Sequence, residues 1–232
     1  MKRETPVTVP TDDGSPTLYL PALDEHYHSV RGAVAESMHV YIKTGLEACG
    51  RETVDLFECG FGTGLNAFLT LLAAGQSRRH IHYTVVEAFP LDAAQAIGLA
   101  YPETIQPGSR PLFEQLHRCE WEREVAITPC FTLHKIETDL TRHPLGDERY
   151  DVIYYDAFAP EKQPELWSAE LLGRVARSLR RGGVLSTYCA KGEVRRRLQQ
   201  AGLTVQRTSG PPGGKREILQ ARRPDDASRT GT

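Results

Sequence analysis

The sequence predicts a doubly wound α/β fold, in which helices cover both faces of a mostly parallel sheet. Apolar runs alternate with segments of helical periodicity along most of the 232 residues. The strand runs are continuously apolar, as in VIYY from Val152 to Tyr155, which is typical of parallel strands buried on both faces. The last two extended runs, LTVQRT and REILQARR, are joined only by SGPPGG. No crossover helix fits there, so these runs should form an antiparallel hairpin at one edge.

An N-terminal extension over residues 1–50 should precede the sheet. The run VTVPTDDGSPTLYL predicts a hairpin that turns at Asp13 and Gly14. After it, apolar residues recur at helical spacing from Val34 to Leu46, and Gly50 stands where a C-terminal helix cap is expected. We therefore expect one amphipathic helix between the hairpin and the first strand of the main sheet.

The main domain should span residues 51–223, followed by a disordered tail over 224–232. A chain of 232 residues suits one such domain with a small addition. The alternating pattern predicts strands over 54–59, 81–87, 131–137, 151–156 and 183–188, and helices over 64–74, 91–100, 165–180 and 192–201.

The composition is that of an ordinary globular protein, with 40% hydrophobic and 25% charged residues. The sequence has neither a signal-peptide core nor the run of about 18 apolar residues that a membrane span requires. We therefore expect a cytoplasmic protein without membrane contact. The five cysteines include no C-x-x-C pair and the eight histidines no H-E-x-x-H motif, so no metal site is predicted.

Basic residues gather toward the C-terminus. From Arg174 onward the chain has 14 lysines and arginines against four acidic residues. Such an excess is the electrostatic footprint of a polyanion partner. Solvated helix faces in segments such as RSLRR would give the same count, so both interpretations stay open.

A glycine-rich stretch, FECGFGTGLNAF at residues 57–68, follows the first predicted strand of the main sheet. Gly60, Gly62 and Gly64 fall between this strand and the next helix. Ligands of open parallel sheets bind at the carboxyl ends of the strands, and glycines there let the backbone approach a ligand closely. The helix N-terminus adds free N–H groups that favour an anion. The stretch thus predicts a nucleotide-like ligand.

Three acidic residues are expected at the same edge of the sheet. Glu87 ends the second strand, Asp139 follows the third and Asp156 ends the fourth. An acid in the position of Glu87 accepts hydrogen bonds from ribose hydroxyls in many binders of this fold. Each of these residues alone is equally consistent with a helix cap or a turn.

The glycine stretch fits two kinds of cofactor. Read from Gly62, GTGLNA satisfies the dinucleotide pattern G-x-G-x-x-G/A, and Glu87 lies at the spacing of an NAD ribose contact. Read from Gly60, the first glycine directly follows the strand, as in binders of S-adenosylmethionine. The loop alone does not decide between them.

The stretch DVIYYDAFAPEKQPELW, from Asp151 to Trp167, makes a family resemblance specific. Together with ECGFGTGLNAF, VVEAFPL, TYCA and GKREI, it resembles the MnmC-like methyltransferase family that completes 5-methylaminomethyl-2-thiouridine at the tRNA wobble position. The resemblance covers residues 20–222. Ala157, Thr138 and Ile218 depart from the family's usual residues, and none of these changes removes a polar group. The sequence resembles the stand-alone form, which lacks the FAD-dependent oxidase domain of many relatives.

The resemblance implies a Rossmann-like, class I methyltransferase with a mostly parallel seven-stranded sheet and an antiparallel edge hairpin. It implies S-adenosylmethionine as the cofactor, without FAD or metal, and methylation of an aminomethyl group on a wobble uridine. The tRNA anticodon loop would be the partner, with no obligate protein partner. In this interpretation Asp156 receives the substrate amine. Cofactor contacts are expected from Tyr27, Glu36, Gly60, Gly62, Gly64, Asn66, Glu87 and Asp139, and substrate contacts from Phe158, Lys215 and Arg216.

Other functions stay open at this point. A methyl- or aminopropyl-transferase acting on a small amine shares the fold and the sulfonium chemistry. A non-catalytic RNA-binding protein with a vestigial cofactor site would retain the same motifs, and a nicotinamide oxidoreductase would share the glycine pattern.

Overall fold

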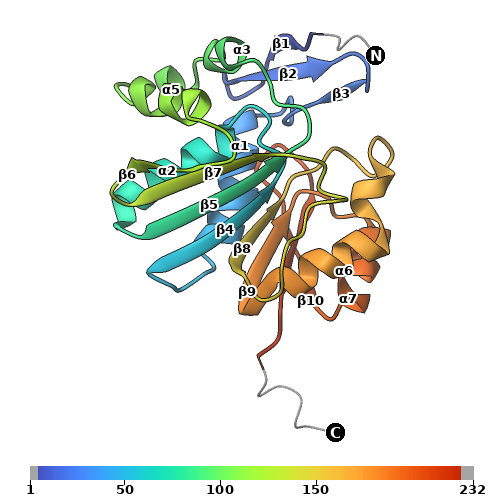
Figure 1. Cartoon of the computed structure of the whole chain (residues 1–232). Helices are drawn as coiled ribbons and strands as arrows, with labels where there is room; N and C mark the ends of the chain where they lie inside the picture. The colour runs from blue at the N-terminus through green and yellow to red at the C-terminus, as the bar shows by residue number, and fades with distance from the viewer. Residues whose placement is uncertain (1–4, 226–232) are drawn as a thin grey trace, which may run out of the picture.

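The computed structural model describes residues 5–225. Its main sheet has eight strands in the order β10-β11-β9-β8-β4-β5-β7-β6 (Figure 1). The five strands from β9 to β7 are parallel, whereas β6, β11 and β10 pair antiparallel with their neighbours. The predicted α/β class and the edge hairpin are confirmed, with one strand more than expected. The strands are β4 (Thr53–Cys59), β5 (His80–Glu87), β6 (Glu124–Thr128), β7 (Phe131–Glu137), β8 (Tyr150–Tyr155), β9 (Leu179–Thr187), β10 (Thr204–Ser209) and β11 (Glu217–Arg222).

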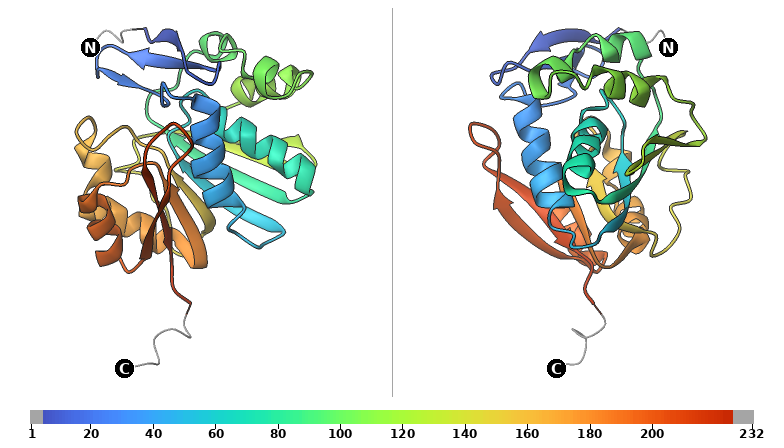
Figure 2. Two further views of the ribbon diagram at one scale, coloured as in Figure 1. Left: turned by 180° about the vertical axis from the view of Figure 1, so that it is seen from behind. Right: turned by 90° about the vertical axis from the view of Figure 1, so that its left-hand side faces the viewer.

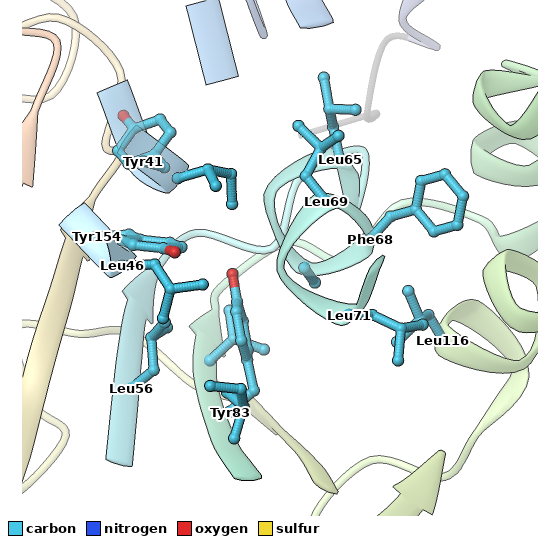
Figure 3. Packing of buried hydrophobic residues seen from close by; sticks show 14 of the residues in the cluster. Tyr41, Leu46, Leu56, Leu65, Phe68, Leu69, Leu71, Tyr83, Leu116 and Tyr154 are labelled. Carbon is cyan, nitrogen blue, oxygen red and sulfur yellow. The ribbon is translucent and has the colours of Figure 1, made fainter. Parts of the chain in front are cut away.

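Helices cover both faces of this sheet (Figures 1 and 2). One face carries α1 (Ala33–Ser37), the π-helix η1 (Met38–Leu46), α2 (Leu65–Ser77) and α5 (Arg110–Arg118), and the other carries α6 (Ala169–Ser178) and α7 (Gly192–Gln200). Side chains of the central strands alternate between two buried clusters, so Tyr154 packs on the α2 side and Tyr155 on the α6 side. Figure 3 shows the first cluster, with Tyr41, Tyr83 and Tyr154 gathered between sheet and helices.

A small antiparallel sheet lies at the carboxyl ends of the parallel strands (Figure 1). It consists of β1 (Val7–Pro10), β2 (Pro16–Leu20) and β3 (Glu25–His26). The predicted hairpin is confirmed, because β1 pairs with β2 from Val7 opposite Tyr19 to Pro10 opposite Pro16. Gly14 adopts φ 82° in the turn, where glycine has no steric penalty.

The expected N-terminal helix is present, but only α1 is α-helical. Its continuation η1 is a nine-residue π-helix, and the Glu47 N–H still bonds to the Ile42 carbonyl five residues back. The prediction that Gly50 caps this helix was wrong. Instead, the Arg79 guanidinium donates to the carbonyls of Leu46 and Cys49, at 3.1 and 2.7 Å.

The largest differences from the sequence pattern fall between residues 91 and 128. The helix expected over 91–100 is shortened to α3 (Ala93–Ile97), and an unpredicted helix, α4 (Tyr101–Ile105), follows the left-handed residue Ala100 at φ 56°. Neither α5 nor β6 was predicted. The helix α5 covers the buried cluster on the α2 side of the sheet. The strand β6 pairs with the outer edge of β7.

The helix predicted over 165–180 begins as the 3₁₀ turn η2 (Pro164–Trp167) and continues as α6. The Ser168 hydroxyl caps α6 by accepting from the Leu171 N–H at 3.3 Å. The helix ends earlier than predicted because β9 already begins at Leu179. Most of the predicted tail lies outside the described residues. Within residues 5–225, no helix has the length and apolar character needed to cross a membrane.

Candidate active site

A cleft of about 1310 Å³ opens at the carboxyl ends of β4, β5 and β8, beneath the small N-terminal sheet. The chain segments that line it are far apart in the sequence and include the glycine stretch and the loop after β8. Two of the predicted site residues, Gly64 and Arg216, do not line the cleft. The ten that do are Tyr27, Glu36, Gly60, Gly62, Asn66, Glu87, Asp139, Asp156, Phe158 and Lys215.

The glycine stretch needs glycine for two different reasons. Gly60 and Gly62 have φ of 89° and 48° and bring bare backbone to the cleft wall. A Cβ on Gly62 would stand 3.0 Å from the Tyr27 ring. Gly64 faces away from the cleft at the start of α2, where a Cβ would meet the His117 ring at 2.8 Å. The cofactor contact expected of Gly64 is therefore not supported by its position, which serves packing.

Glu87 joins the second strand end to the glycine loop. Its Oε2 accepts hydrogen bonds from the N–H groups of Phe61 and Gly62 at 3.0 and 3.1 Å, and its Oε1 accepts from the Phe89 N–H at 2.8 Å. A carboxylate oxygen has two lone pairs, so the side chain can still accept from a ligand in the cleft. Glu87 therefore holds the glycine loop in place and can also accept a hydrogen bond from a ligand bound beside that loop.

Asp139 is at once a turn residue and a cleft residue. Its Oδ1 accepts from both the N–H and the hydroxyl of Thr141, each at 2.8 Å. Of the two interpretations left open by the sequence, helix cap or turn residue, the turn is therefore correct for this oxygen. The residue also lines the cleft beside Thr138 and Leu140.

Asp156 directly follows β8 and is held from two sides. The Tyr41 hydroxyl donates to its Oδ1 at 2.5 Å, and the Asn66 amide donates to its Oδ2 at 2.8 Å. Burial raises the pKa of this carboxyl to about 6, and the nearby Glu36 acts in the same direction. The hydrogen bonds from Tyr41 and Asn66 and the charge of Lys215 oppose that rise in pKa.

A second carboxyl, Glu58, lies beneath the cleft and was missed in the sequence. The same Asn66 amide donates to its Oε1 at 2.8 Å, and the Tyr83 hydroxyl donates to its Oε2 at 2.7 Å. Burial raises the pKa of Glu58 well above its ordinary value. The available signal was an acid in the apolar second half of β4, two residues before Gly60. Tyr41 was also missed, since its spacing marks it only as a core position.

Aromatic rings form the wall on the β8 side. Tyr27 meets Phe158 edge to face, with ring centroids 5.1 Å apart. The Phe158 carbonyl accepts from the Trp167 indole N–H at 2.7 Å, and Trp167 itself is fully buried against Tyr155. Trp167 is thus a core residue that shapes the loop, while Phe158 lines the cleft.

The basic C-terminal part does not form one patch at the cleft. Arg174 donates to the carbonyls of Thr141 and His143, Arg180 pairs with Asp55 and Asp151, and Arg223 pairs with Glu148. The net charge of the segment therefore overstates the charge that a partner meets. Lys215 does reach the cleft, where its Nζ lies 3.6 Å from the centroid of the Tyr188 ring, and Arg216 is exposed beside it. Among the described residues, no group of His, Cys, Asp or Glu is arranged to hold a metal ion.

Comparison with known proteins shows what the chain is similar to. Residues 115–224 match a family model described as S-adenosyl-L-methionine-dependent methyltransferase. The chain is 35% identical over 228 residues to the "tRNA 5-methylaminomethyl-2-thiouridine biosynthesis bifunctional protein MnmC" of Cupriavidus metallidurans, covering 91% of this chain and 33% of that protein. Over the matched residues, the chain is thus similar to S-adenosylmethionine-dependent methyltransferases. The protein of the same name from Delftia acidovorans is 34% identical, with 93% and 35% covered.

The chain spans about a third of the length of the curated relatives it matches. Among solved structures, MNMC2 from Aquifex aeolicus has a TM-score of 0.78 at 24% identity and covers 95% of this chain and 72% of that one. Spermidine synthase from Thermotoga maritima has a TM-score of 0.54 at 13% identity, with 95% and 73% covered. Both likenesses show a shared fold.

Proposed function

We propose that the protein methylates the amine of 5-aminomethyl-(2-thio)uridine at the tRNA wobble position, giving 5-methylaminomethyl-(2-thio)uridine. The observation that carries this proposal is Asp156, a carboxyl fixed by two hydrogen bonds at the cleft end of β8, with a pKa raised to about 6. The similarity to MnmC supports the choice of substrate.

The cleft fits S-adenosylmethionine. Gly60 and Gly62 present backbone without side chains, and Glu87 stands at the adjacent strand end. In our assignment the two glycines meet the methionine part, Glu87 the ribose hydroxyls and Asp139 the adenine amine. Tyr27 and Glu36, from the N-terminal part, cover the cofactor. When bound, the cofactor supplies an electrophilic methyl group.

The substrate amine has to lose a proton before it can attack the methyl group, and Asp156 can accept that proton. An alkylammonium has no free lone pair, and with a lysine-like pKa its deprotonation at pH 7 costs about 4 to 5 kcal/mol. The uracil ring lowers that cost by withdrawing electron density. A carboxyl whose pKa is about 6 is mostly ionised at neutral pH, so Asp156 can accept a hydrogen bond from the amine, orient it and take up its proton. The remaining barrier is met by holding nitrogen and methyl in line.

The substrate base has to leave its stack to reach this carboxyl. A wobble base lies in a single-stranded loop and is splayed out at little cost. Phe158 lines the cleft and offers a ring against which the base can pack. Lys215 lines the cleft and Arg216 is exposed beside it, so both can contact the tRNA phosphates next to the splayed base.

The test is methyl transfer to defined tRNA. The protein is incubated with S-adenosylmethionine and tRNA that carries the 5-aminomethyl group, and the nucleosides are then analysed by mass spectrometry. We expect one added methyl on that nucleoside and none on tRNA lacking the aminomethyl group. Methylation or aminopropylation of free polyamines in a parallel reaction, with unchanged tRNA, would overturn the proposal. Binding of NAD in preference to S-adenosylhomocysteine would do so as well.

A further inference from the structure

The buried carboxyl of Glu58 and the half-buried carboxyl of Asp156 share one amide. Asn66 Nδ2 donates one hydrogen bond to Glu58 Oε1 and one to Asp156 Oδ2, each of 2.8 Å. A phenol hydroxyl closes each end, Tyr83 on Glu58 and Tyr41 on Asp156. The result is a continuous hydrogen-bonded row from the core to the cleft, built from β5, β4, α2, the end of β8 and η1.

We propose that Tyr41 and Asn66 are positioning residues that clamp Asp156, fixing the direction of its carboxylate and keeping it ionised at neutral pH. The clamp occupies one lone pair on each oxygen of Asp156, so the remaining lone pairs are available on the cleft side. That the held carboxylate receives an amine rests on the proposed function. The clamp itself rests only on the contacts in the protein.

Core packing alone does not explain Tyr41. Its ring is buried and lies 5.2 Å from the ring of Tyr154, a contact that phenylalanine would make equally well. The hydroxyl adds a bond to an ionisable group, and such charge-assisted bonds are about twice as strong as neutral ones. Burial also raises the pKa of Tyr41 well above its ordinary value, so its hydroxyl stays a donor throughout the working pH range.

The orientation of the Asn66 amide is not explained by core packing either. Its Oδ1 is buried without a hydrogen-bond partner among the described residues, which costs free energy for a polar atom. Turning the amide would not help, because it would point that oxygen at two carboxyls. The structure therefore keeps an unfavourable oxygen in order to direct both N–H groups at Glu58 and Asp156.

The hydrogen bonds from Tyr41 and Asn66 oppose the effect of the surroundings on the pKa of Asp156. Glu36 from α1, Glu58 from β4 and Glu87 from β5 face the same region, and Tyr188 and Cys59 add buried groups that are neutral when protonated. Lys215 is the cation that acts on Asp156, from the loop between β10 and β11. Burial and acidic neighbours favour the protonated acid, and the two donors, together with the charge of Lys215, oppose them and hold the pKa of Asp156 near 6.

The test compares Tyr41→Phe with Tyr154→Phe, a matched control. Tyr154 is equally buried and its hydroxyl contacts Thr70 at 3.3 Å instead of a carboxyl. In protein labelled with ¹³C at the aspartate carboxyls, the Asp156 signal is assigned with Asp156→Asn and titrated without substrate. We expect the midpoint to rise by about one pH unit in Tyr41→Phe and to stay unchanged in Tyr154→Phe.

The same variants are then measured for methyl transfer. The acid limb of kcat/KM should move upward with the carboxyl midpoint in Tyr41→Phe, while S-adenosylhomocysteine affinity stays within about twofold. If the Asp156 midpoint is the same in wild type and Tyr41→Phe, the clamp is refuted regardless of activity. A shifted midpoint in a protein that does not methylate tRNA would support the clamp and reject the proposed function. Should Tyr41→Phe not fold, Asn66→Ala removes the other donor and must shift the midpoint in the same direction.

Discussion

Asp156 owes its place to strand geometry and its acidity to its neighbours. As the residue after β8 it has to lie at the carboxyl edge of the sheet, beside the loop after β4. Its sequence position therefore predicted its location. Its partners Tyr41 and Glu58 were not predictable, because helical spacing and strand alternation state which face a side chain takes but not which distant atom it meets.

Removing the carboxyl should separate chemistry from cofactor binding. In Asp156→Ala we expect methyl transfer to fall by about 100-fold or more, because the amine loses its acceptor. The affinity for S-adenosylhomocysteine, measured by calorimetry, should change less than about threefold. Equal losses in both measurements would make Asp156 a cofactor ligand instead.

Glu87 should behave in the opposite way. In Glu87→Gln the side chain loses its charge and half of its acceptors, so both the glycine loop and a bound ribose lose hydrogen bonds. We expect S-adenosylhomocysteine affinity to fall by about tenfold. Glu137→Gln is the matched control, since Glu137 ends the adjacent strand opposite Glu87 but is exposed and outside the cleft. If both variants bind equally well, Glu87 has no ligand role.

At the scale of elements, the glycine loop was the most predictable part of the site. A glycine at every second position after a strand indicates backbone near a ligand, and Gly60 and Gly62 line the cleft. The same pattern does not show that Gly64 packs on His117, because that contact depends on α5, a helix whose short polar sequence gave no clear signal. The π-helix was equally hidden, since its apolar spacing resembles that of an α-helix over a few turns.

A methyl group added to the glycine loop should weaken ligand binding and lower stability where the loop lines the cleft. Gly62→Ala forces a left-handed alanine and places a Cβ 3.0 Å from Tyr27. We expect weaker S-adenosylhomocysteine binding by about tenfold and a lower Tm. Gly75→Ala, in the exposed last turn of α2 with open space around it, should raise stability by about 0.5 to 1 kcal/mol. Unchanged binding in Gly62→Ala would show that the ligand does not need this backbone.

The hairpin of β10 and β11 should carry the salt sensitivity of tRNA binding. Replacing Lys215 and Arg216 together with alanine should weaken binding and reduce the slope of log K against log salt by about two. Arg207→Ala is the control, because Arg207 lies on the same hairpin and pairs with Glu217 at 3.2 Å. A wild-type affinity that does not change with salt would remove nucleic acid from the proposal.

Across the whole molecule, buried histidines make stability depend on pH. Burial lowers the pKa of His117 to about 4 from an ordinary value of 6.5, so the unfolded chain takes up the proton first as the pH falls. His117 therefore contributes stability above pH 6.5 that is lost progressively down to pH 4. The stability difference between wild type and His117→Gln, from urea denaturation, should shift by roughly 3 kcal/mol against wild type between pH 7 and pH 4. A difference that does not vary with pH would contradict the assigned pKa.

The sequence predicts the architecture better than its details. Continuous apolar strands and intervening helical periods gave the parallel sheet and both faces of helices, because these patterns follow from burial. The N-terminal hairpin was found from its turn residues. The antiparallel strand β6 and the helices between β5 and β7 lie where the hydrophobic periodicity of the sequence is interrupted. Tertiary contacts form these elements, so local propensity did not predict them.

The π-helix η1 is completed by the other end of the chain. Gln220 donates to the Thr44 carbonyl at 2.7 Å, Arg222 to that of Ala48 at 3.0 Å, and Gly45 lies against Ser186 and Tyr154. An isolated helix this short has little stability of its own in water. Residues 38–46 therefore need β9 and β11 in place to complete their contacts. The hydrogen bond from Tyr41 to Asp156 thus depends on segments from both ends of the chain, so a change in β11 can reach the cleft without touching it.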